Sequence, residues 1–235
     1  MKMLSVSPSL TEQVYRAVLD EIMEGRLKPG SHLVQEQLAA QLGVSRQPIQ
    51  QAMALLKADG IVEEVGKRGL RVASLDLGLM QCHYDMRMLL DGYAARRAAQ
   101  AIQDGTIDPE TLRAEFNEIL AIGSDAIRAD SVTDQIRYDQ AFHKLIYDAS
   151  RNRVLRDTAG PNWRYLRRVM AEVLMHAESA PTIWDQHLAI KDAILAGDPD
   201  RAGDLAEDHV RTAVDSLTEA LKRLRQEPEQ VASVA

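Results

Sequence analysis

The sequence predicts a mainly α-helical protein, in which an N-terminal winged helix-turn-helix precedes an antiparallel all-α helical bundle. Residues 42–56 combine a glycine turn with a short amphipathic helix. Two short segments rich in β-branched residues follow, joined by a turn, and the chain beyond residue 75 has helical periodicity throughout. Aromatic residues make up only 4% of the chain, which favours packed helices over sheets. We therefore expect two domains, residues 1–74 and 75–235.

The composition fits this division. The chain has 235 residues, of which 46% are hydrophobic, and this suits two modest cores better than one large core. Its one cysteine, Cys82, excludes an internal disulfide and fits a reducing compartment. No apolar run reaches the roughly 18 residues that a membrane span needs. The first residues are too short and polar for a signal peptide. We expect a cytoplasmic protein with no membrane partner.

The charge is unevenly distributed. The net charge is -7, but residues 1–74 contain 9 Lys+Arg and 8 Asp+Glu, so the negative charge lies in the remainder. A near-neutral N-terminal domain on an acidic body can still bind a phosphate backbone through local basic residues.

In the N-terminal domain we expect a first helix over residues 11–24, capped by Thr11, and a second over residues 35–42. Gly43 permits the tight turn that follows, and a third helix runs to about Asp59, where Gly60 ends it. Residues 61–65 and 70–73 are predicted to form two strands.

The third helix is predicted to be the recognition helix of a helix-turn-helix. Ser45 occupies its expected N-cap position. The apolar residues form one buried stripe: Ile49, Ala52, Met53 and Leu56. The exposed N-terminal end presents the candidate DNA contacts: Ser45, Arg46, Gln47, Gln50 and Gln51. The alternative is an amphipathic helix that binds no DNA.

The turn between the two strands, Gly66-Lys67-Arg68-Gly69, is predicted to be the tip of a wing. Lys67, Arg68 and Gly69 would then contact the DNA backbone or the minor groove. The alternative is an ordinary solvated turn, but its place directly after a helix-turn-helix favours a wing.

The order of these elements closely resembles the N-terminal domain of the GntR family of bacterial transcription regulators. The matching residues cover nearly all of residues 11–74: Gly25-x-Leu27-x-Pro29-Gly30, Leu33, Leu38-Ala39, Leu42-Gly43-Val44-Ser45-Arg46-x-Pro48-Ile49, Ala52, Leu55-Leu56, Asp59-Gly60-Ile61-Val62 and Gly69-x-x-Val72. The family places an Arg-Glu pair where this chain has Gln50-Gln51. That arginine normally contacts DNA, so Gln50 departs from the family's usual operator contact, because Gln pairs with adenine whereas Arg prefers guanine.

The body is expected to contain six helices, with boundaries read from Asp, Ser, Pro and Gly signals. Their expected ranges are residues 76–103, 109–129, 131–149, 154–176, 181–197 and 199–224. The fourth should break or kink at Gly160-Pro161, and the tail from Gln226 should be frayed.

Three of these helices place polar side chains on their apolar faces. Asp139 and His143 share one face, and His187 and His209 lie on the apolar faces of the last two helices. An unpaired buried carboxylate costs several kcal/mol, so these groups need one another or a shared partner. One Asp and three His suit a divalent transition metal such as Zn²⁺ or Ni²⁺. For each histidine alone, the alternative is a hydrogen-bonded core residue.

The body also resembles the helical ligand-binding domain of the GntR branch related to the fatty-acid regulator. The pattern Asp139-x-x-x-His143, followed by His187 and His209, matches the ligand set of that branch. The resemblance implies a metal in a pocket that helps to bind a small carboxylate effector. Arg87 matches a family arginine lining this pocket, although a surface or dimer-contact role is an alternative. Asp91 stands where the family usually has Glu.

We therefore expect a ligand-responsive, DNA-binding regulator, most simply a repressor, with residues 75–235 as its effector-binding and dimerisation domain. A homodimer would require a near-palindromic operator. One alternative is a metal-dependent hydrolase, in which an open coordination position activates water. Against it, no further Glu or Asp stands out as a general base, and such an enzyme needs no DNA-reading domain. The other alternative is a purely structural metal.

Overall fold

The computed structural model describes residues 8–66, 69–174 and 182–232. The contacts divide the chain into two compact units, Met1–Leu75 and Asp76–Ala235, each with a core of its own. This division lies one residue beyond the boundary expected from the sequence.

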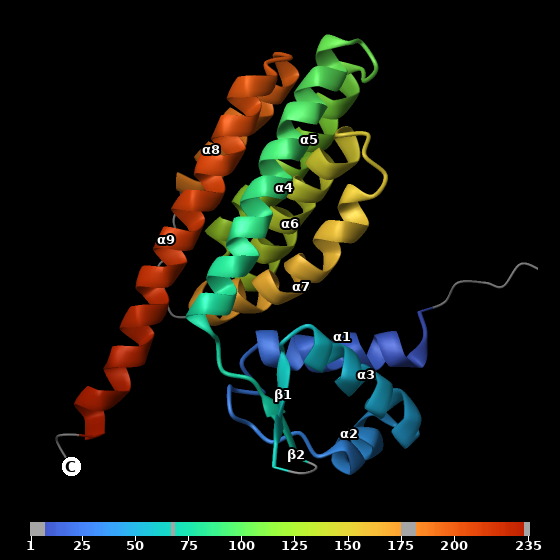
Figure 1. Ribbon diagram of the computed structural model, residues 1–235, viewed down its shortest axis with the longest axis vertical. Coiled ribbons are helices and arrows are strands. Elements are labelled where there is room, and N and C mark those ends of the chain that lie inside the picture. Colours follow the sequence, from blue (N-terminus) through green and yellow to red (C-terminus); the bar gives the residue numbers. More distant parts are fainter. Residues whose placement is uncertain (1–7, 67–68, 175–181, 233–235) are drawn as a thin grey trace, which may run out of the picture. The chain divides into compact units, whose positions relative to one another are not determined.

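The N-terminal unit is a winged helix-turn-helix (Figure 1). Its helices are α1 (Leu10–Met23), α2 (Gln35–Leu42) and α3 (Arg46–Ala58), followed by the strands β1 (Val62–Val65) and β2 (Gly69–Val72). The strands pair antiparallel, with Val62 opposite Val72 and Val65 opposite Gly69. The helices and the hairpin share one apolar core that includes Val18, Ile49, Leu56, Ile61 and Val72.

Details at three helix ends differ from the sequence expectations. Ser9, not Thr11, caps α1, because the helix starts one residue before Thr11; Ser9 Oγ accepts from the Glu12 N–H at 3.1 Å. Ser45 does occupy the N-cap position of α3, but its side chain accepts no capping hydrogen bond from any residue that the structure describes. Leu42, expected to face inward, is 38% exposed.

Local geometry favours glycine at several positions of this unit, among them Gly43 and Gly69. Gly43 has φ +64°, a left-handed conformation in which its N–H caps α2 by donating to the Ala39 carbonyl. A Cβ on Gly69 would lie 2.7 Å from the Val65 carbonyl oxygen, so the close approach of the two strands excludes a side chain there. The hairpin itself therefore accounts for Gly69, whatever its role toward DNA.

The C-terminal unit is an all-α bundle (Figure 1). Its helices are α4 (Leu77–Gln103), α5 (Pro109–Arg128), α6 (Val132–Ala149), α7 (Leu155–Leu174), α8 (Thr182–Leu195) and α9 (Pro199–Ala232). The long helix α4 packs along α9 and also against α6, α7 and α8, while α5 packs against α6 and α8. Asp76, Asp108 and Ser131, which stand at the expected starts of three helices, all accept hydrogen bonds from backbone N–H groups of the first turn.

Two expectations about this unit differ from the structure. Of the break or kink expected at Gly160-Pro161, a break is excluded, because helix α7 continues through both residues. A proline removes one backbone hydrogen bond, here to the Asp157 carbonyl, but the packed residues on both sides keep the helix intact. Helix α9 continues to Ala232, beyond the expected end at Leu224 and through the tail from Gln226. His176 and Pro181, expected near helix ends, lie outside the described residues.

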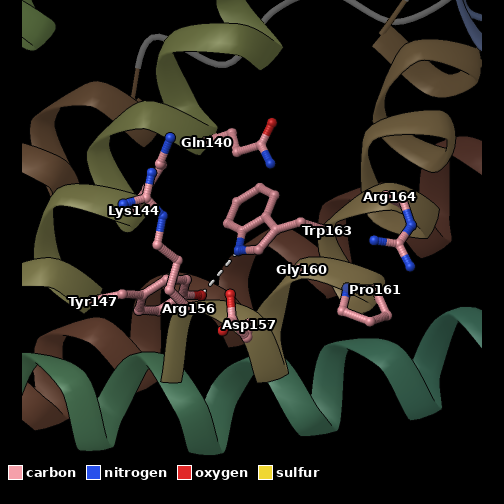
Figure 2. Close-up of a pocket in the computed structure, with 9 residues that line it drawn as sticks. All are labelled: Gln140, Lys144, Tyr147, Arg156, Asp157, Gly160, Pro161, Trp163 and Arg164. Atoms are coloured by element: carbon pink, nitrogen blue, oxygen red, sulfur yellow. Dashed lines mark hydrogen bonds between the residues drawn. The ribbon is translucent and has the colours of Figure 1, made fainter. Parts of the chain in front are cut away.

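Helices α6 and α7 leave a cleft of about 370 Å³ between them, beside Gly160 and Pro161 (Figure 2). Among the described residues, no helix is both long enough and apolar enough to cross a membrane.

Candidate functional site

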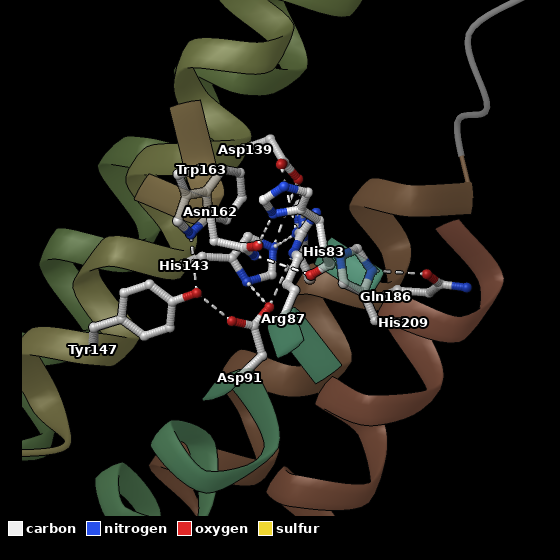
Figure 3. Close-up of polar contacts among 11 residues, drawn as sticks. His83, Arg87, Asp91, Asp139, His143, Tyr147, Asn162, Trp163, Gln186 and His209 are labelled. Atoms are coloured by element: carbon white, nitrogen blue, oxygen red, sulfur yellow. Dashed lines mark hydrogen bonds and ion pairs between the residues drawn. The ribbon is translucent and has the colours of Figure 1, made fainter. Parts of the chain in front are cut away.

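The four predicted metal ligands lie together inside the helical bundle. Figure 3 labels three of them, Asp139, His143 and His209. Asp139 and His143 project from α6, one turn apart, while His187 comes from α8 and His209 from α9. One ligand atom from each residue lies within 4.8 Å of the others, and no side chain of the four is more than slightly exposed. Residues up to 70 positions apart in the sequence thus meet at one point.

Several polar atoms of this cluster have no hydrogen-bond partner among the described residues. They are Asp139 Oδ2, both ring nitrogens of His187, and His209 Nε2. His187 Nε2 lies 3.3 Å from Asp139 Oδ1, and His143 Nε2 lies 3.7 Å from the same oxygen. Buried polar atoms without partners are costly, and a shared cation would satisfy all of them.

The residues fit a divalent transition metal. Three imidazole nitrogens and one carboxylate are the donors that Zn²⁺ and Ni²⁺ prefer, at about 2.0–2.2 Å from the ion. Ligand atoms within 4.8 Å of one another reach such distances after small movements of their side chains.

The environment holds most of these groups in their metal-binding protonation states. Burial lowers the pKa of His187 to about 4, although Asp139 opposes this, and burial also lowers the pKa of His209 well below its usual value. Burial alone would raise the pKa of Asp139, but Arg87 and the neighbouring histidines hold it well below its usual value. The two imidazoles are therefore neutral and the carboxylate is ionised, as metal ligation requires.

Two of the histidines are oriented by hydrogen bonds from their outer ring nitrogens. His143 Nδ1 lies 3.0 Å from Asp91 Oδ2, and His209 Nδ1 lies 2.9 Å from Gln186 Oε1. With the proton on Nδ1, the Nε2 lone pair faces the cluster. Burial and the Arg87 charge lower the pKa of His143, but the Asp91 and Asp139 carboxylates have the larger effect. The pKa of His143 is therefore raised above its usual value. The Arg87 N–H directed at His143 Nε2 nevertheless requires this nitrogen to be unprotonated.

Arg87 lies in the same centre. Its side chain is 1% exposed, so the alternative of a surface arginine does not fit the structure. Its Nε donates to Asp91 Oδ2 at 3.1 Å, and its Nη2 lies 2.7 Å from His143 Nε2 and 3.7 Å from Asp139 Oδ2. The guanidinium also stacks on Trp163, 4.3 Å from the ring centroid.

Two residues that support the proposed ligands, Tyr147 and Trp163, were not predicted from the sequence. Tyr147 Oη donates to Asp91 Oδ1 and accepts from Trp163 Nε1 at 3.0 Å, so Trp163, Tyr147, Asp91 and His143 form one buried chain. Spacing offered a partial signal, because Asp91 lies one turn after Arg87 and Tyr147 one turn after His143. Nothing in the sequence indicated which side chains of α4, α6 and α7 contact one another.

In the N-terminal unit, the start of α3 is exposed, as expected for a recognition helix. Ser45, Gln47 and Gln50 are exposed, and the Arg46 side chain is 70% exposed, paired with Glu36 at 3.4 Å. Such an exposed pair is weak, so Arg46 can exchange Glu36 for a DNA group at little cost.

The other predicted DNA contacts differ in their surroundings. Gln51 is exposed too, but its Oε1 accepts from Thr11 Oγ1 at 2.7 Å, which ties it to α1. Gly69 is half-buried within the hairpin. Lys67 and Arg68 lie outside the described residues.

Comparison with known proteins identifies the two units separately. Residues 10–72 match the family model described as bacterial regulatory proteins, gntR family, and residues 83–212 match that of the FCD domain.

Individual relatives match over most of the chain. The HTH-type transcriptional repressor RspR of Escherichia coli (strain K12) is 24% identical over 224 residues, which cover 95% of this chain and 94% of the relative. The Glc operon transcriptional activator of the same strain is 30% identical over 228 residues, covering 88% of this chain and 89% of the relative. The structure of E. coli McbR/YncC, 20% identical, superposes with a TM-score of 0.76 over 91% of this chain and 99% of that one, and so has the same fold.

Both family matches agree with the fold, which combines a winged helix-turn-helix with a helical bundle. The chain belongs to the GntR family and is a DNA-binding transcriptional regulator whose C-terminal domain is an FCD domain.

Proposed function

We propose that this regulator senses a small organic acid through a divalent metal held by Asp139, His143, His187 and His209. The observation that carries the proposal is the buried cluster itself, in which donors from three helices converge and several have no other partner. Zn²⁺ or Ni²⁺ fits this donor set best. When bound, the metal supplies a Lewis-acid centre that attracts a carboxylate.

The charges around the cluster favour an anionic effector. Arg87 carries one positive charge, and Asp91 and Asp139 carry two negative charges. A divalent ion therefore leaves the centre with one net positive charge in a buried environment, which one carboxylate would neutralise. Since the His143 Nε2 lone pair can serve only one partner, metal ligation frees Arg87 Nη2 to donate to the effector.

At the operator, we infer that Ser45, Arg46, Gln47, Gln50 and Gln51 form the base- and phosphate-contacting end of α3. Lys67, Arg68 and Gly69 would contact DNA as the wing. The protein would act in the cytoplasm as a homodimer on a near-palindromic operator, because two-fold symmetry presents two recognition helices to two half-sites. We propose that it is a repressor, as the similar RspR is named.

The centre suits sensing better than hydrolysis. A hydrolase of this type would need a carboxylate that is free to act as a general base. Asp91 is engaged by Arg87, His143 and Tyr147, and Asp139 belongs to the ligand set. Against a purely structural metal, the buried Arg87 beside the ligands provides a group for an effector to bind.

The test is metal content combined with operator binding. Wild-type protein purified without chelator should contain about one metal ion per chain. His187→Ala should lose the metal and the response to effector, yet still bind DNA. A thermal-shift screen of small carboxylates identifies the effector, because a ligand that binds the folded state raises Tm. The matched control is His32→Ala, which removes an exposed histidine of the N-terminal unit.

A metal-free wild type would overturn the proposal. A metal-loaded protein whose Tm and operator binding respond to no carboxylate would instead support a structural metal. Release of product from a carboxylic ester or amide, lost in His187→Ala, would support the hydrolase.

A further inference from the structure

Two buried side chains beside the metal centre have polar atoms without a hydrogen-bond partner among the described residues. These atoms are Tyr84 Oη, on α4, and Gln135 Nε2, on α6. Tyr84 is 0% exposed and Gln135 is 7% exposed, and neither residue belongs to the proposed ligand set. A buried hydroxyl or amide without a partner costs free energy, so a bound ligand that pairs with both groups would be favoured there.

Helices α4 and α6 run in the same direction through the metal centre. Arg87 of α4 contacts His143 of α6. One turn later on both helices, Asp91 of α4 contacts Tyr147 of α6. A residue that lies one turn before Arg87 on α4 is therefore level with the turn before His143 on α6, which contains the proposed ligand Asp139.

The two unpaired groups lie on the same side of the centre, toward the N-terminal ends of both helices. Tyr84 precedes Arg87 by three residues, and the Arg87 guanidinium carbon lies 5.8 Å from the Tyr84 ring centroid. Gln135 precedes Asp139 by four residues, so both lie on one face of α6, about 6 Å apart along the helix axis. Because helical side chains lean toward the N-terminus, Tyr84 and Gln135 both extend away from the proposed ligands in the same direction.

The opposite side of the centre is closed by groups that pair with one another. Tyr147 donates to Asp91 and accepts from Trp163, and Asp91 also accepts from Arg87 (Figure 3). Within the part of the chain that the structure describes, no buried polar side-chain atom of Asp91, Tyr147 or Trp163 lacks a partner. An effector held at the metal therefore finds unpaired groups only in the direction of Tyr84 and Gln135.

The charge of the centre limits what the effector can carry in that direction. Arg87, Asp91, Asp139 and a divalent ion together leave one net positive charge, which one carboxylate neutralises. A second carboxylate would then be an uncompensated buried charge. The Tyr84 hydroxyl and the Gln135 amide are neutral groups that donate to an oxygen atom and also accept from a hydroxyl. A neutral oxygen fits both of them.

We propose that Tyr84 and Gln135 form a second subsite of the effector pocket, which binds a hydroxyl or oxo oxygen of the effector. The effector would then be a hydroxy- or oxo-monocarboxylate, with its carboxylate at the metal and Arg87. Its neutral oxygen would point toward the N-terminal ends of α4 and α6. This inference rests on the proposed function and adds to it the class of the effector and two residues that select it.

Isothermal titration calorimetry on the full-length, zinc-loaded protein tests the subsite with matched acids. The probes are 3- and 4-hydroxybutanoate against butanoate, 4-oxopentanoate against pentanoate, and succinate as the dianion. At least one hydroxy or oxo acid should bind wild type about tenfold more tightly than its unsubstituted partner, the value of one hydrogen bond to a buried group. Succinate should bind more weakly than that acid, because its second carboxylate would be buried without a counter-charge.

Two variants separate the subsite from the metal. Tyr84→Phe removes only a hydroxyl that has no described partner, so the effector-free protein should keep an unchanged or higher Tm. Gln135→Met keeps the length of the side chain and removes its amide. Each variant should lose most of the preference for the hydroxy or oxo acid, and should bind zinc and the unsubstituted acid as wild type does. The control is Tyr93→Phe, at a position of α4 that is 43% exposed, and it should retain the preference.

The outcomes distinguish the subsite from the proposed function. Equal binding of substituted and unsubstituted acids to wild type would overturn the subsite and leave metal-dependent sensing intact. A preference that persists in both Tyr84→Phe and Gln135→Met would also overturn the subsite, because the oxygen would then bind the metal itself. A zinc-loaded wild type that binds none of these acids would overturn the proposed function, and the subsite with it.

Discussion

Asp91 orients His143 although it touches none of the other three proposed ligands in any described contact. It accepts hydrogen bonds from Arg87, His143 and Tyr147, and its side chain is 2% exposed. Burial would raise the pKa of Asp91, but His143 and Arg87 outweigh it and lower the pKa, so the carboxylate is ionised. An ionised acceptor fixes the His143 tautomer and increases the basicity of the nitrogen that faces the cluster.

Asp91→Asn should therefore weaken Zn²⁺ binding about 10- to 100-fold, because the amide keeps the size of the side chain but loses its charge. Competition with a chromophoric chelator measures this affinity. Asp85→Asn, at an exposed position of the same helix, is the control and should behave as wild type. An Asp91→Asn protein with wild-type zinc affinity would show that Asp91 only supports packing.

Arg46 is the residue on which the recognition-helix interpretation depends most. Arg46→Ala should weaken operator binding by about 1–3 kcal/mol if the side chain contacts a base. Gel-shift titration at constant salt measures the change. Glu36→Ala should bind at least as tightly as wild type, since it removes only the competing partner of Arg46. Unchanged affinity in Arg46→Ala would contradict the assignment.

At the scale of elements, the two strands of the hairpin approach each other closely. We propose that the turn between them contacts DNA. The antiparallel register brings Gly69 opposite Val65, where a side chain would meet the backbone. A short, rigid hairpin can hold basic residues at a constant distance from a DNA groove.

Replacing both Lys67 and Arg68 with Ala should reduce the slope of log K against log salt by up to about 2, because each phosphate contact releases about one counterion. Fluorescence anisotropy with an operator duplex over a series of salt concentrations measures the slope. The control is Lys57→Ala, which also removes a positive charge from this unit. Lys57 lies at the end of α3 in an exposed ion pair with Glu64. If affinity and slope both equal those of wild type, the hairpin does not contact DNA.

At the scale of the whole molecule, the proposed metal would act as a cross-link. Its ligands come from α6, α8 and α9, which are distant in sequence and pack in one bundle. A ligand that binds only the folded chain stabilises it in proportion to the logarithm of its concentration over Kd. Occupancy would thus stiffen the domain that we propose dimerises and could pass its state to the DNA-binding units.

Stripping the metal should lower the stability of the C-terminal unit by about 4 kcal/mol if the metal is present at a thousand times its Kd. Differential scanning calorimetry before and after chelation, and after zinc is restored, measures the shift. His187→Ala should show no dependence on zinc. A wild-type Tm that does not change on chelation and reloading would argue against a metal shared by three helices.

The sequence by itself determined most of the elements and the identity of the proposed ligands. Helix and strand patterns are local, so apolar spacing and capping residues such as Asp76, Asp108 and Ser131 sufficed to locate them within a few residues. The residues of the cluster could be named from the sequence because Asp139, His143, His187 and His209 each interrupt an apolar helix face, a feature visible within single helices.

The tertiary structure alone decided how these residues are supported. The contacts of Asp91 with His143 and Tyr147, and of Arg87 with Trp163, join residues more than 50 positions apart, and their geometry depends on how α4, α6 and α7 pack. The continuity of α7 past Pro161 and the cleft beside Gly160 likewise arise from packing that outweighs a local helix-breaking signal. Local patterns determine which face of a helix is buried; which side chains meet there depends on the free energy of packing the whole bundle.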